Sequence, residues 1–338
     1  MGAAADAQRD LGLRAGACQP ARWPAQQPIE RISYTPPMKI GVILPAAESD
    51  GQGATPSWMT IKSYALAAET RGLDSVWLFD HFFDKPTDGP TTGQHEAWTL
   101  VSAVAAVTER VQIGTIVLCS TFRSPTLVAK MAAAADEVSA GRLILGLGAG
   151  WHDPEYDAFG FPKDHRVDRF EEALQIIVPL LSGRTVTFDG RYHQARDAVL
   201  LPPPAHAIPV LVAAFGPRML QLAARHADAW NTAWYGAPDE RLRKNMETFD
   251  RAIASEGREA SSVQRTVGMI VNDPDVEGLS DPPDDEDASF SGSVEELADA
   301  IDAYEASGID HLIVLLQPLT IASLDRLSLA LGRRSRPS

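Results

Sequence analysis

From Met38 onward, the chain alternates between two kinds of hydrophobic pattern. Short, mostly apolar runs rich in Val, Ile and Leu predict buried strands, whereas segments with apolar residues every three or four positions predict helices. The predicted strands are residues 39–44, 75–80, 112–119, 142–147, 209–215, 229–234, 264–271 and 311–317. The predicted helices are residues 58–71, 96–108, 125–139, 168–181, 217–226, 238–256, a segment from 293, and 322–331.

Turn and capping residues mark the ends of several of these elements. Gly72 and Gly141 follow predicted helices, where glycine commonly takes the left-handed position that ends a helix. Ser293 and Glu296 have the spacing of a capping box, which opens a helix. An Asp-Gly pair within residues 185–193 predicts a small hairpin.

Eight strand–helix units in one chain predict a (β/α)8 TIM barrel, with insertions after the fourth strand and near the seventh. A doubly wound sheet is the alternative for the same alternation. The alternating glycines that end at Gly150 argue against it, because Trp151 stands where a dinucleotide-binding fingerprint has Gly or Ala. We expect one barrel domain over residues 38–333.

Composition and charge narrow the class of protein. The 338 residues are 45% hydrophobic, which is ample for one large core, and the formal net charge is −15. Such a charge disfavours nucleic acid as a partner. Eight acidic residues without a Lys or Arg lie between Asp273 and Asp287, so residues 272–290 are expected to form an acidic mobile loop.

The N-terminal segment and the cysteines indicate the cellular compartment that we expect for the protein. Residues 1–37 lack the apolar stretch of a secretory signal and are expected to be a disordered extension or a mis-assigned start, with Met38 as the natural beginning. Only Cys18 and Cys119 are present, which fits a reducing cytoplasm. No apolar run approaches the roughly 18–20 residues of a membrane span.

The ends of the predicted strands carry the candidate chemistry. Asp80 and His81 end the second strand, and glycines followed by Trp151 end the fourth. His152, Asp153, Glu155 and His165 suggest metal ligands, but no tight ligand pair is present, so this segment is expected to be a solvated loop and no metal is predicted. Motifs of serine hydrolases, P-loop proteins and zinc peptidases are absent from the sequence.

Several segments, in order and spacing, resemble the bacterial-luciferase-like superfamily of flavin- and deazaflavin-dependent oxidoreductases. The resemblance runs from Met38 to about Leu331 and is carried by residues 80–82, 113–117, 121–125, 139–151, Gly160, Arg166, Arg169, 213–218 and 227–230. It implies a barrel with a flavin-type ring at its C-terminal mouth. It also implies a non-prolyl cis peptide after the third strand, at Ile116–Val117, under the middle of the ring.

The resemblance further implies which residues form the site. Asp80 and His81 would contact the ring beside its reacting carbon, and together with Trp151 they form the expected catalytic group. The expected cofactor-binding residues are Asp80, His81, Ile116, Val117, Cys119, Gly148, Gly150, Ala213, Ala214, Phe215, Gly216 and Arg218. Cys119 is expected to make contacts without acting as a nucleophile. Arg218 either pairs with a phosphate or is solvated.

Substrate contacts are expected from Glu96, Trp98 and Trp151. Glu96 could instead favour the start of a helix, and Trp151 could instead belong to the core. The chain departs from the glucose-6-phosphate dehydrogenase branch, because Trp151 replaces an acid and Lys85 stands near that branch's Trp. The departure argues against sugar-phosphate oxidation.

The expected function is hydride transfer to or from a small organic substrate with the deazaflavin coenzyme F-420 (F420). The alternative is an FMN-dependent monooxygenase of the alkanesulfonate or luciferase type, supplied by a separate reductase. A non-catalytic flavin-binding protein and a metal-dependent hydrolase are the options from other classes. The family resemblance also implies a homodimer. Residues 152–166 and 272–290 are the candidate lids.

Overall fold

The structure is a computed structural model that describes residues 37–50, 53–86, 89–276 and 288–334. Eight parallel strands follow one another around a barrel, and the pairing of β10 with β7 closes it. In chain order they are β1 (Lys39–Ile43), β2 (Ser75–Leu78), β5 (Gln112–Thr115), β7 (Leu143–Gly148), β10 (Val210–Ala213), β11 (Ala229–Tyr235), β12 (Gln264–Asn272) and β14 (His311–Gln317). The closed ring confirms the predicted TIM barrel and excludes the doubly wound sheet.

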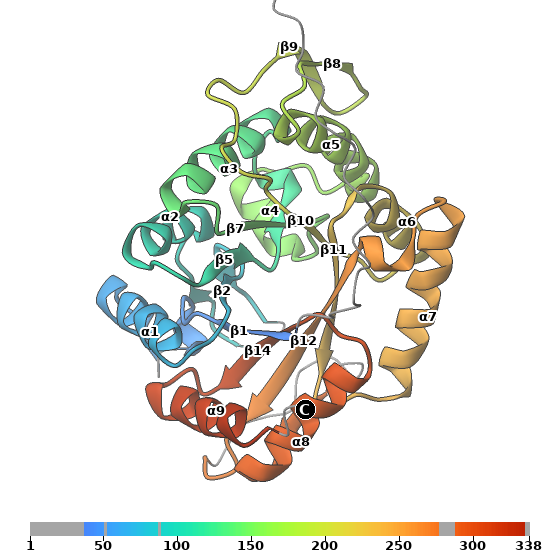
Figure 1. Ribbon diagram of the computed structural model, residues 1–338. Helices are drawn as coiled ribbons and strands as arrows, with labels where there is room; N and C mark the ends of the chain where they lie inside the picture. Colours follow the sequence, from blue (N-terminus) through green and yellow to red (C-terminus); the bar gives the residue numbers. More distant parts are fainter. Residues whose placement is uncertain (1–36, 51–52, 87–88, 277–287, 335–338) are drawn as a thin grey trace, which may run out of the picture. The chain divides into compact units, whose positions relative to one another are not determined.

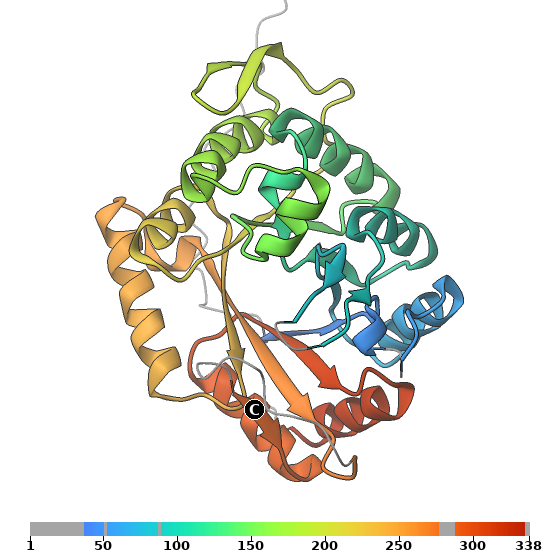
Figure 2. The ribbon, with the colours of Figure 1, turned by 180° about the vertical axis from the view of Figure 1, so that it is seen from behind.

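Helices surround the strands on the outside of the barrel (Figures 1 and 2). They are α1 (Trp58–Thr70), α2 (Ala97–Val107), α3 (Pro125–Ser139), α5 (Arg166–Leu181), α6 (Pro217–His226), α7 (Glu240–Ser255), α8 (Val294–Ala306) and α9 (Ile321–Arg333). Their buried faces are apolar and pack on the strands. The Ser293–Glu296 capping box forms as predicted at the start of α8.

Shorter elements lie at the C-terminal ends of the strands and on the outer surface of the barrel. They are η1 (Glu48–Asp50), β3 (Phe83–Asp84), β4 (Thr92–Gly93), β6 (Leu118–Cys119), η2 (Ser120–Phe122), α4 (Asp153–Phe159), β8 (Val186–Asp189), β9 (Gln194–Ala198), η3 (Ala260–Ser262) and β13 (Ser289–Ser291). β8 and β9 form the predicted hairpin, although its second strand extends five residues beyond His193. β13 pairs with β12 near the predicted insertion at the seventh strand.

The segment after β7 corrects one expectation. Residues 152–166 were expected to be a solvated loop, but Asp153–Phe159 form α4, which lies inside the ring of helices next to the end of β7 (Figure 1). The helix ends at Gly160, whose φ of 75° is left-handed. Glu155 and Tyr156 on this helix are buried, so the segment carries part of the site.

The barrel's N-terminal end holds a buried polar cluster. His311, at the start of β14, lies 2.7 Å from the Ser75 hydroxyl through its Nε2, and the Trp77 indole donates to the same hydroxyl. Trp77 also packs edge-on against the His311 ring. This cluster lies at the opposite end from the strand termini that carry Asp80 and His81.

Two further expectations concern the ends of the chain and the acidic segment. The extension at 1–37 lies outside the described residues, except for Pro37. Within 272–290, Asn272 ends β12 and Ser289 begins β13, while 277–287 lie outside the described residues. Of the helices in the described ranges, none is both long and apolar enough to cross a membrane.

Candidate active site

A cavity of about 970 Å³ opens at the C-terminal ends of the barrel strands. Most of the predicted site residues line it: Asp80, His81, Ile116, Val117, Cys119, Gly148, Gly150, Trp151, Ala213, Phe215 and Gly216. Their strands are widely separated in sequence and meet here because parallel barrel strands end on one rim. The fold therefore brings eleven predicted residues into one space.

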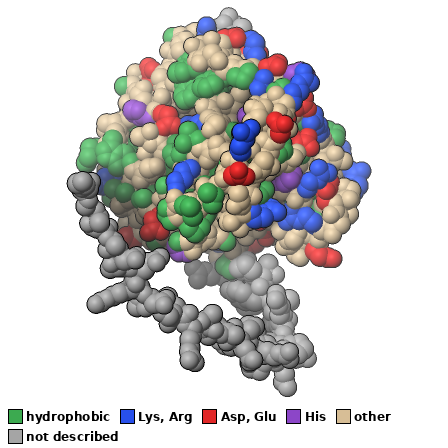
Figure 3. Space-filling view, turned by 90° about the horizontal axis from the view of Figure 1, so that it is seen from above, with side chains coloured by type: hydrophobic (Ala, Val, Ile, Leu, Met, Phe, Trp, Pro, Cys, Tyr) green, Lys and Arg blue, Asp and Glu red, His purple; other side chains and the backbone are tan. Residues whose placement is uncertain are grey.

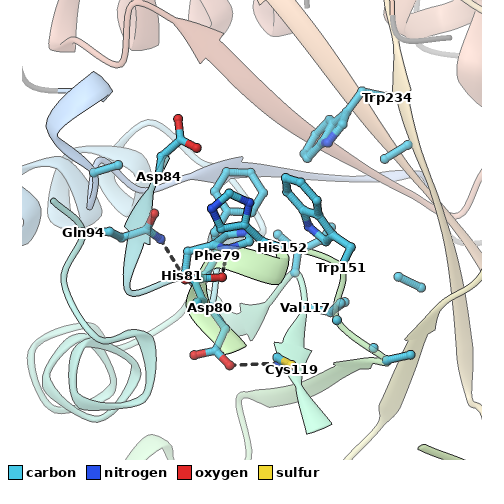
Figure 4. Close-up of a pocket in the computed structure, with 18 of the residues that line it drawn as sticks. Phe79, Asp80, His81, Asp84, Gln94, Val117, Cys119, Trp151, His152 and Trp234 are labelled. Carbon is cyan, nitrogen blue, oxygen red and sulfur yellow. Dashed lines mark hydrogen bonds and ion pairs between the residues drawn. The ribbon is translucent and has the colours of Figure 1, made fainter. Parts of the chain in front are cut away.

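Asp80 turns away from the cavity centre toward Cys119 (Figure 4). Its buried carboxylate accepts the Cys119 N–H at 2.9 Å and two N–H bonds from Arg123, at 2.8 and 3.0 Å. Burial raises the pKa of the Asp80 carboxyl, and the guanidinium opposes that rise. The two-pronged contact with Arg123 fixes the carboxylate and the turn after β2.

Glu96 and Trp98 do not have the expected substrate-facing positions. Glu96 caps α2 by accepting the N–H groups of Trp98 and Thr99, and its other partner is Arg123. Although burial alone would raise it, the pKa of Glu96 is lowered by hydrogen bonds from Thr99 and Arg123. Trp98 is only 7% exposed and packs in the core. Neither residue lines the cavity, so the alternative role of Glu96 as a helix-start charge is the one the structure shows.

His81 is held by a carboxylate that the sequence did not single out as its partner. His81 Nδ1 lies 2.9 Å from Glu155 Oε2 on α4. The other oxygen of Glu155 accepts the backbone N–H of Phe82 and lies 3.5 Å from that of Phe83. The contact could not be read from sequence, since Glu155 comes 74 residues later and on an element that was expected to be a loop.

The peptide bond between Ile116 and Val117 is cis, as the family resemblance implied. It lies between β5 and β6, where both side chains line the cavity. Nearby, the Cys119 thiol lies 3.1 Å from the Tyr156 hydroxyl. Burial raises the pKa of Cys119 to about 11, so at neutral pH the group is a protonated thiol and a weak nucleophile.

Gly148 and Gly150 are required by the protein's own packing. A Cβ on Gly148 would press against the Val117 side chain, and one on Gly150 would overlap the Tyr156 hydroxyl and the Cys119 sulfur. Gly150 also has a φ of 78°, which side chains rarely adopt. The glycines thus let β6 and α4 approach the end of β7, which shapes the cavity floor.

The start of α6 meets the cavity through Phe215 and Gly216. Gly216 is the N-cap residue and has no side chain to cap the helix, so among the described residues the first N–H groups of α6 have no side-chain acceptor. Ala214 is buried beside Trp230 and does not line the cavity. Arg218 pairs with Asp168 at 2.5 Å and Glu171 at 2.7 Å on α5, away from the cavity.

Ring side chains gather on one part of the cavity wall, where Figure 4 shows Phe79, His81, His152 and Trp151 together and Trp234 nearby. Trp151 is 68% exposed, so the alternative that it belongs to the core is wrong. Its ring meets that of His81 edge-on at 5.5 Å. Trp234 was not among the predicted site residues, because its strand is otherwise typical of a buried one.

Other lining residues were also missed, among them Phe79, Tyr156, Arg166 and Asn231. Arg166 pairs with Asp153, and its guanidinium lies over the Tyr156 ring at 4.6 Å. Within the described part of the chain, no cluster of three or more His, Cys, Asp or Glu side chains is arranged to hold a metal ion.

A family described as luciferase-like monooxygenase matches residues 38–275. This chain belongs to that family. It is 33% identical to an F420-dependent glucose-6-phosphate dehydrogenase of Microbacterium testaceum over 212 residues, 62% of each chain. It is 39% identical to the protein of the same name from Amycolatopsis mediterranei over 173 residues, 49% of this chain and 51% of that one.

The match thus spans less than two thirds of the length of these curated relatives.

Solved structures show the same fold. An F420-dependent secondary alcohol dehydrogenase in complex with an F420-acetone adduct superposes with a TM-score of 0.73 at 22% identity, covering 86% of this chain and 97% of that one. A monooxygenase, RslO1 of Streptomyces bottropensis, superposes with a TM-score of 0.66 at 19% identity, covering 88% and 98%.

Proposed function

We propose that this luciferase-like protein is an oxidoreductase that uses F420 for hydride transfer to or from a small organic substrate. One observation carries the proposal: His81, held by Glu155, lines the same cavity as the uncapped start of α6 and the cis peptide Ile116–Val117. Several curated relatives named as F420-dependent dehydrogenases support the choice of coenzyme.

The described residues fit such a cofactor. The uncapped N-terminus of α6 offers backbone N–H groups to a phosphate, and open space surrounds Gly216. Ile116 and Val117 supply a floor for a flat ring, with Ala213 also on the cavity. Bound F420 would supply a ring carbon that accepts or donates hydride. Arg218 is not part of this cradle, because two carboxylates of α5 hold it.

His81 is the proposed proton-handling group. Its ring lines the cavity, and an imidazole nitrogen can accept or donate a proton. We propose that Asp80 acts indirectly on the cofactor ring. Its carboxylate binds Arg123, and this contact fixes the turn after β2. Trp151 is proposed as a substrate wall, since it is exposed at the cavity and packs on His81.

The cavity favours an uncharged substrate over a sugar phosphate. Arg166 is the single Lys or Arg among the described lining residues, and Asp153 already pairs with it. Phe79, Trp151 and Trp234 supply apolar ring faces instead. We therefore propose a flat, apolar substrate with one alcohol or carbonyl group, which differs from the substrate in the curated relatives' names.

The competing function is an FMN-dependent monooxygenase that receives reduced flavin from a separate reductase. It is favoured by the similar fold of the monooxygenase RslO1, and a riboflavin lyase with modified FMN superposes with a TM-score of 0.72 at 17% identity. Both candidates use the same cavity, so cofactor binding separates them.

The deciding experiment is a fluorescence titration of cofactor-free protein with F420 and with FMN at fixed ionic strength. We expect tight binding of F420, and a Gly216→Asp variant should weaken it at least tenfold by placing a negative charge at the start of α6. Glu171→Gln is the matched control and should leave affinity unchanged. Tight binding of FMN alone would favour the monooxygenase, and binding of neither would overturn both proposals.

We also propose a homodimer formed through α3. Leu127, Met131, Ala134 and Val138 lie along one face of that helix and are exposed or half-buried. The face seen in Figure 3 shows apolar patches among side chains of both charges. A Leu127→Glu variant should convert a dimer to a monomer in size-exclusion chromatography with light scattering. Leu329→Glu on α9 is the exposed control, and a monomeric wild type would contradict the proposal.

A further inference from the structure

The contact between α4 and the turn after β2 assigns a role to a side chain outside the expected site. We infer that Glu155 is a positioning residue that keeps the proton of neutral His81 on Nδ1 and leaves Nε2 as the proton acceptor at the cavity. The catalytic consequence of this arrangement rests on the proposed function, whereas the arrangement itself does not.

The Glu155 carboxylate is built to accept hydrogen bonds. It is 1% exposed, and the backbone N–H of Phe82 donates to Oε1, with that of Phe83 at 3.5 Å. A backbone N–H can only donate, so Oε1 must accept. An ionised carboxylate is acceptor-only, and Oε2 at 2.9 Å then requires the proton of His81 to sit on Nδ1.

The rest of the His81 ring is held by neighbours that leave Nε2 free. Trp151 meets the ring edge-on at 5.5 Å, and His152 does so at 6.0 Å. Among the described residues, none forms a hydrogen bond to Nε2. The side chain is 26% exposed and lines the cavity, so substrate can reach the ring.

This tautomer allows His81 Nε2 to accept a proton from a substrate hydroxyl group. When a substrate alcohol is oxidised, its O–H proton would pass to His81 Nε2, bound F420 would accept the C–H hydride, and the product would be a carbonyl. In the reverse reaction, protonated His81 would return the proton to oxygen while F420 supplied hydride to carbon. The opposite tautomer presents an N–H to the alcohol and cannot accept its proton.

The helix α4 places Glu155 within hydrogen-bond distance of His81. Trp151 and Glu155 are four residues apart, on either side of the helix start, and both contact His81. One connection thus supplies the ring's packing neighbour and its hydrogen-bond acceptor. Asp157, two residues farther on, instead pairs with Lys163 at the surface and does not line the cavity.

The test is the tautomer of His81, read from long-range proton–nitrogen NMR correlations of the full chain with 15N-labelled histidine, without cofactor, above pH 8. His81→Gln identifies the signals. The wild type should show a protonated Nδ1. In Glu155→Gln, the amide oxygen must still accept from Phe82, so the amide N–H₂ faces His81 and should move the proton to Nε2.

Asp157→Asn is the matched control and should keep the wild-type tautomer. With F420 and a substrate, Glu155→Gln should lower kcat at least about 100-fold, the scale of lost acid–base catalysis, with cofactor affinity changed less than about twofold. A protonated Nε2 in the wild type overturns the inference, even if Glu155→Gln does not fold. An unchanged tautomer in Glu155→Gln also overturns it, whatever the activity.

The two proposals fail separately. If neither F420 nor FMN binds, the proposed function falls while the NMR result still decides the tautomer. If F420 binds and hydride transfer is measured but the tautomer is wrong, the function stands and the role of Glu155 falls.

Discussion

At the residue scale, the neighbouring side chains Asp80 and His81 play separate roles. Successive side chains of an extended segment point in opposite directions. Asp80 accordingly turns toward Arg123 and Cys119, and His81 turns toward Glu155. Of these two residues, His81 keeps a ring nitrogen, Nε2, without a hydrogen-bond partner among the described residues, so we propose the proton chemistry for His81, while Asp80 secures the turn.

Cys119 should resist alkylation. Because burial raises the thiol pKa to about 11, a Cys18→Ser protein should react with iodoacetamide at pH 8 roughly 100-fold more slowly than a free cysteine. The rate should still rise about tenfold for each pH unit between 8 and 10. Mass spectrometry measures both rates, with urea-unfolded protein as the reference. A rate that levels off near pH 9 would contradict the raised pKa.

The sequence predicted the residues on the rim better than their partners. Strand ends locate Asp80, His81 and Gly150, because barrel strands end together. Three residues were expected to bind cofactor or substrate but have other neighbours. Arg218 pairs with carboxylates, Glu96 pairs with the Arg123 guanidinium, and Trp98 packs in the core. Those partners lie on other elements, and nothing local in the sequence reveals them.

At the scale of elements, the strand–helix alternation was predictable and the connections were not. α3, α6 and β14 have the predicted bounds, since each combines a clear period with a proline, glycine or polar stop. α4 was missed because seven residues are too few to show a helical period. The third predicted strand divides into β5 and β6 around the Ile116–Val117 bond.

The junction of β7 with α4 should be intolerant of a single added methyl. Gly150→Ala combines a left-handed φ with overlap against Tyr156 and Cys119, so it should cost about 2–4 kcal/mol in the free energy of unfolding. Gly160→Ala is the control, since its φ is also positive but nothing lies near its Cβ, and about 1 kcal/mol is expected. Urea denaturation measures both.

Tyr156→Phe tests the cause of the overlap. It removes the nearest atom to the added methyl, so the double variant Gly150→Ala with Tyr156→Phe should be less destabilised than the two single changes added together. Equal losses for Gly150→Ala and Gly160→Ala would show that backbone conformation alone sets the cost.

At the scale of the whole molecule, the barrel separates stability from chemistry. The mouth carries His81 and the α6 terminus, whereas the N-terminal end carries the buried His311 cluster. Burial lowers the pKa of His311 to about 3. His311, Ser75 and Trp77 do not line the cavity, and this end bears on how stability changes with pH.

The protein should lose stability on mild acidification because of His311. In the unfolded chain this imidazole takes up a proton below about pH 6.5, while in the folded state it stays neutral until about pH 3. Stability from this group is thus complete above pH 7 and declines as pH falls. Between pH 7 and 5 the loss should be about 2 kcal/mol.

His311→Gln supplies the comparison for that loss. Urea denaturation of both proteins at pH 7 and 5 should show a smaller decrease for the variant, by about the same 2 kcal/mol. His95→Gln, at an exposed histidine outside the cluster, is the control. Identical pH dependence in wild type and His311→Gln would contradict a neutral buried imidazole.

The order of strands around the barrel also sets where the chain can be cut for recombinant work. The matched family region ends at residue 275, but β14 lies between β12 and β1 and comes later in the chain. A fragment stopping at 275 would leave β12 and β1 as facing, unpaired edges, which are templates for aggregation. Soluble expression should therefore require the last strand and α9, through residue 334.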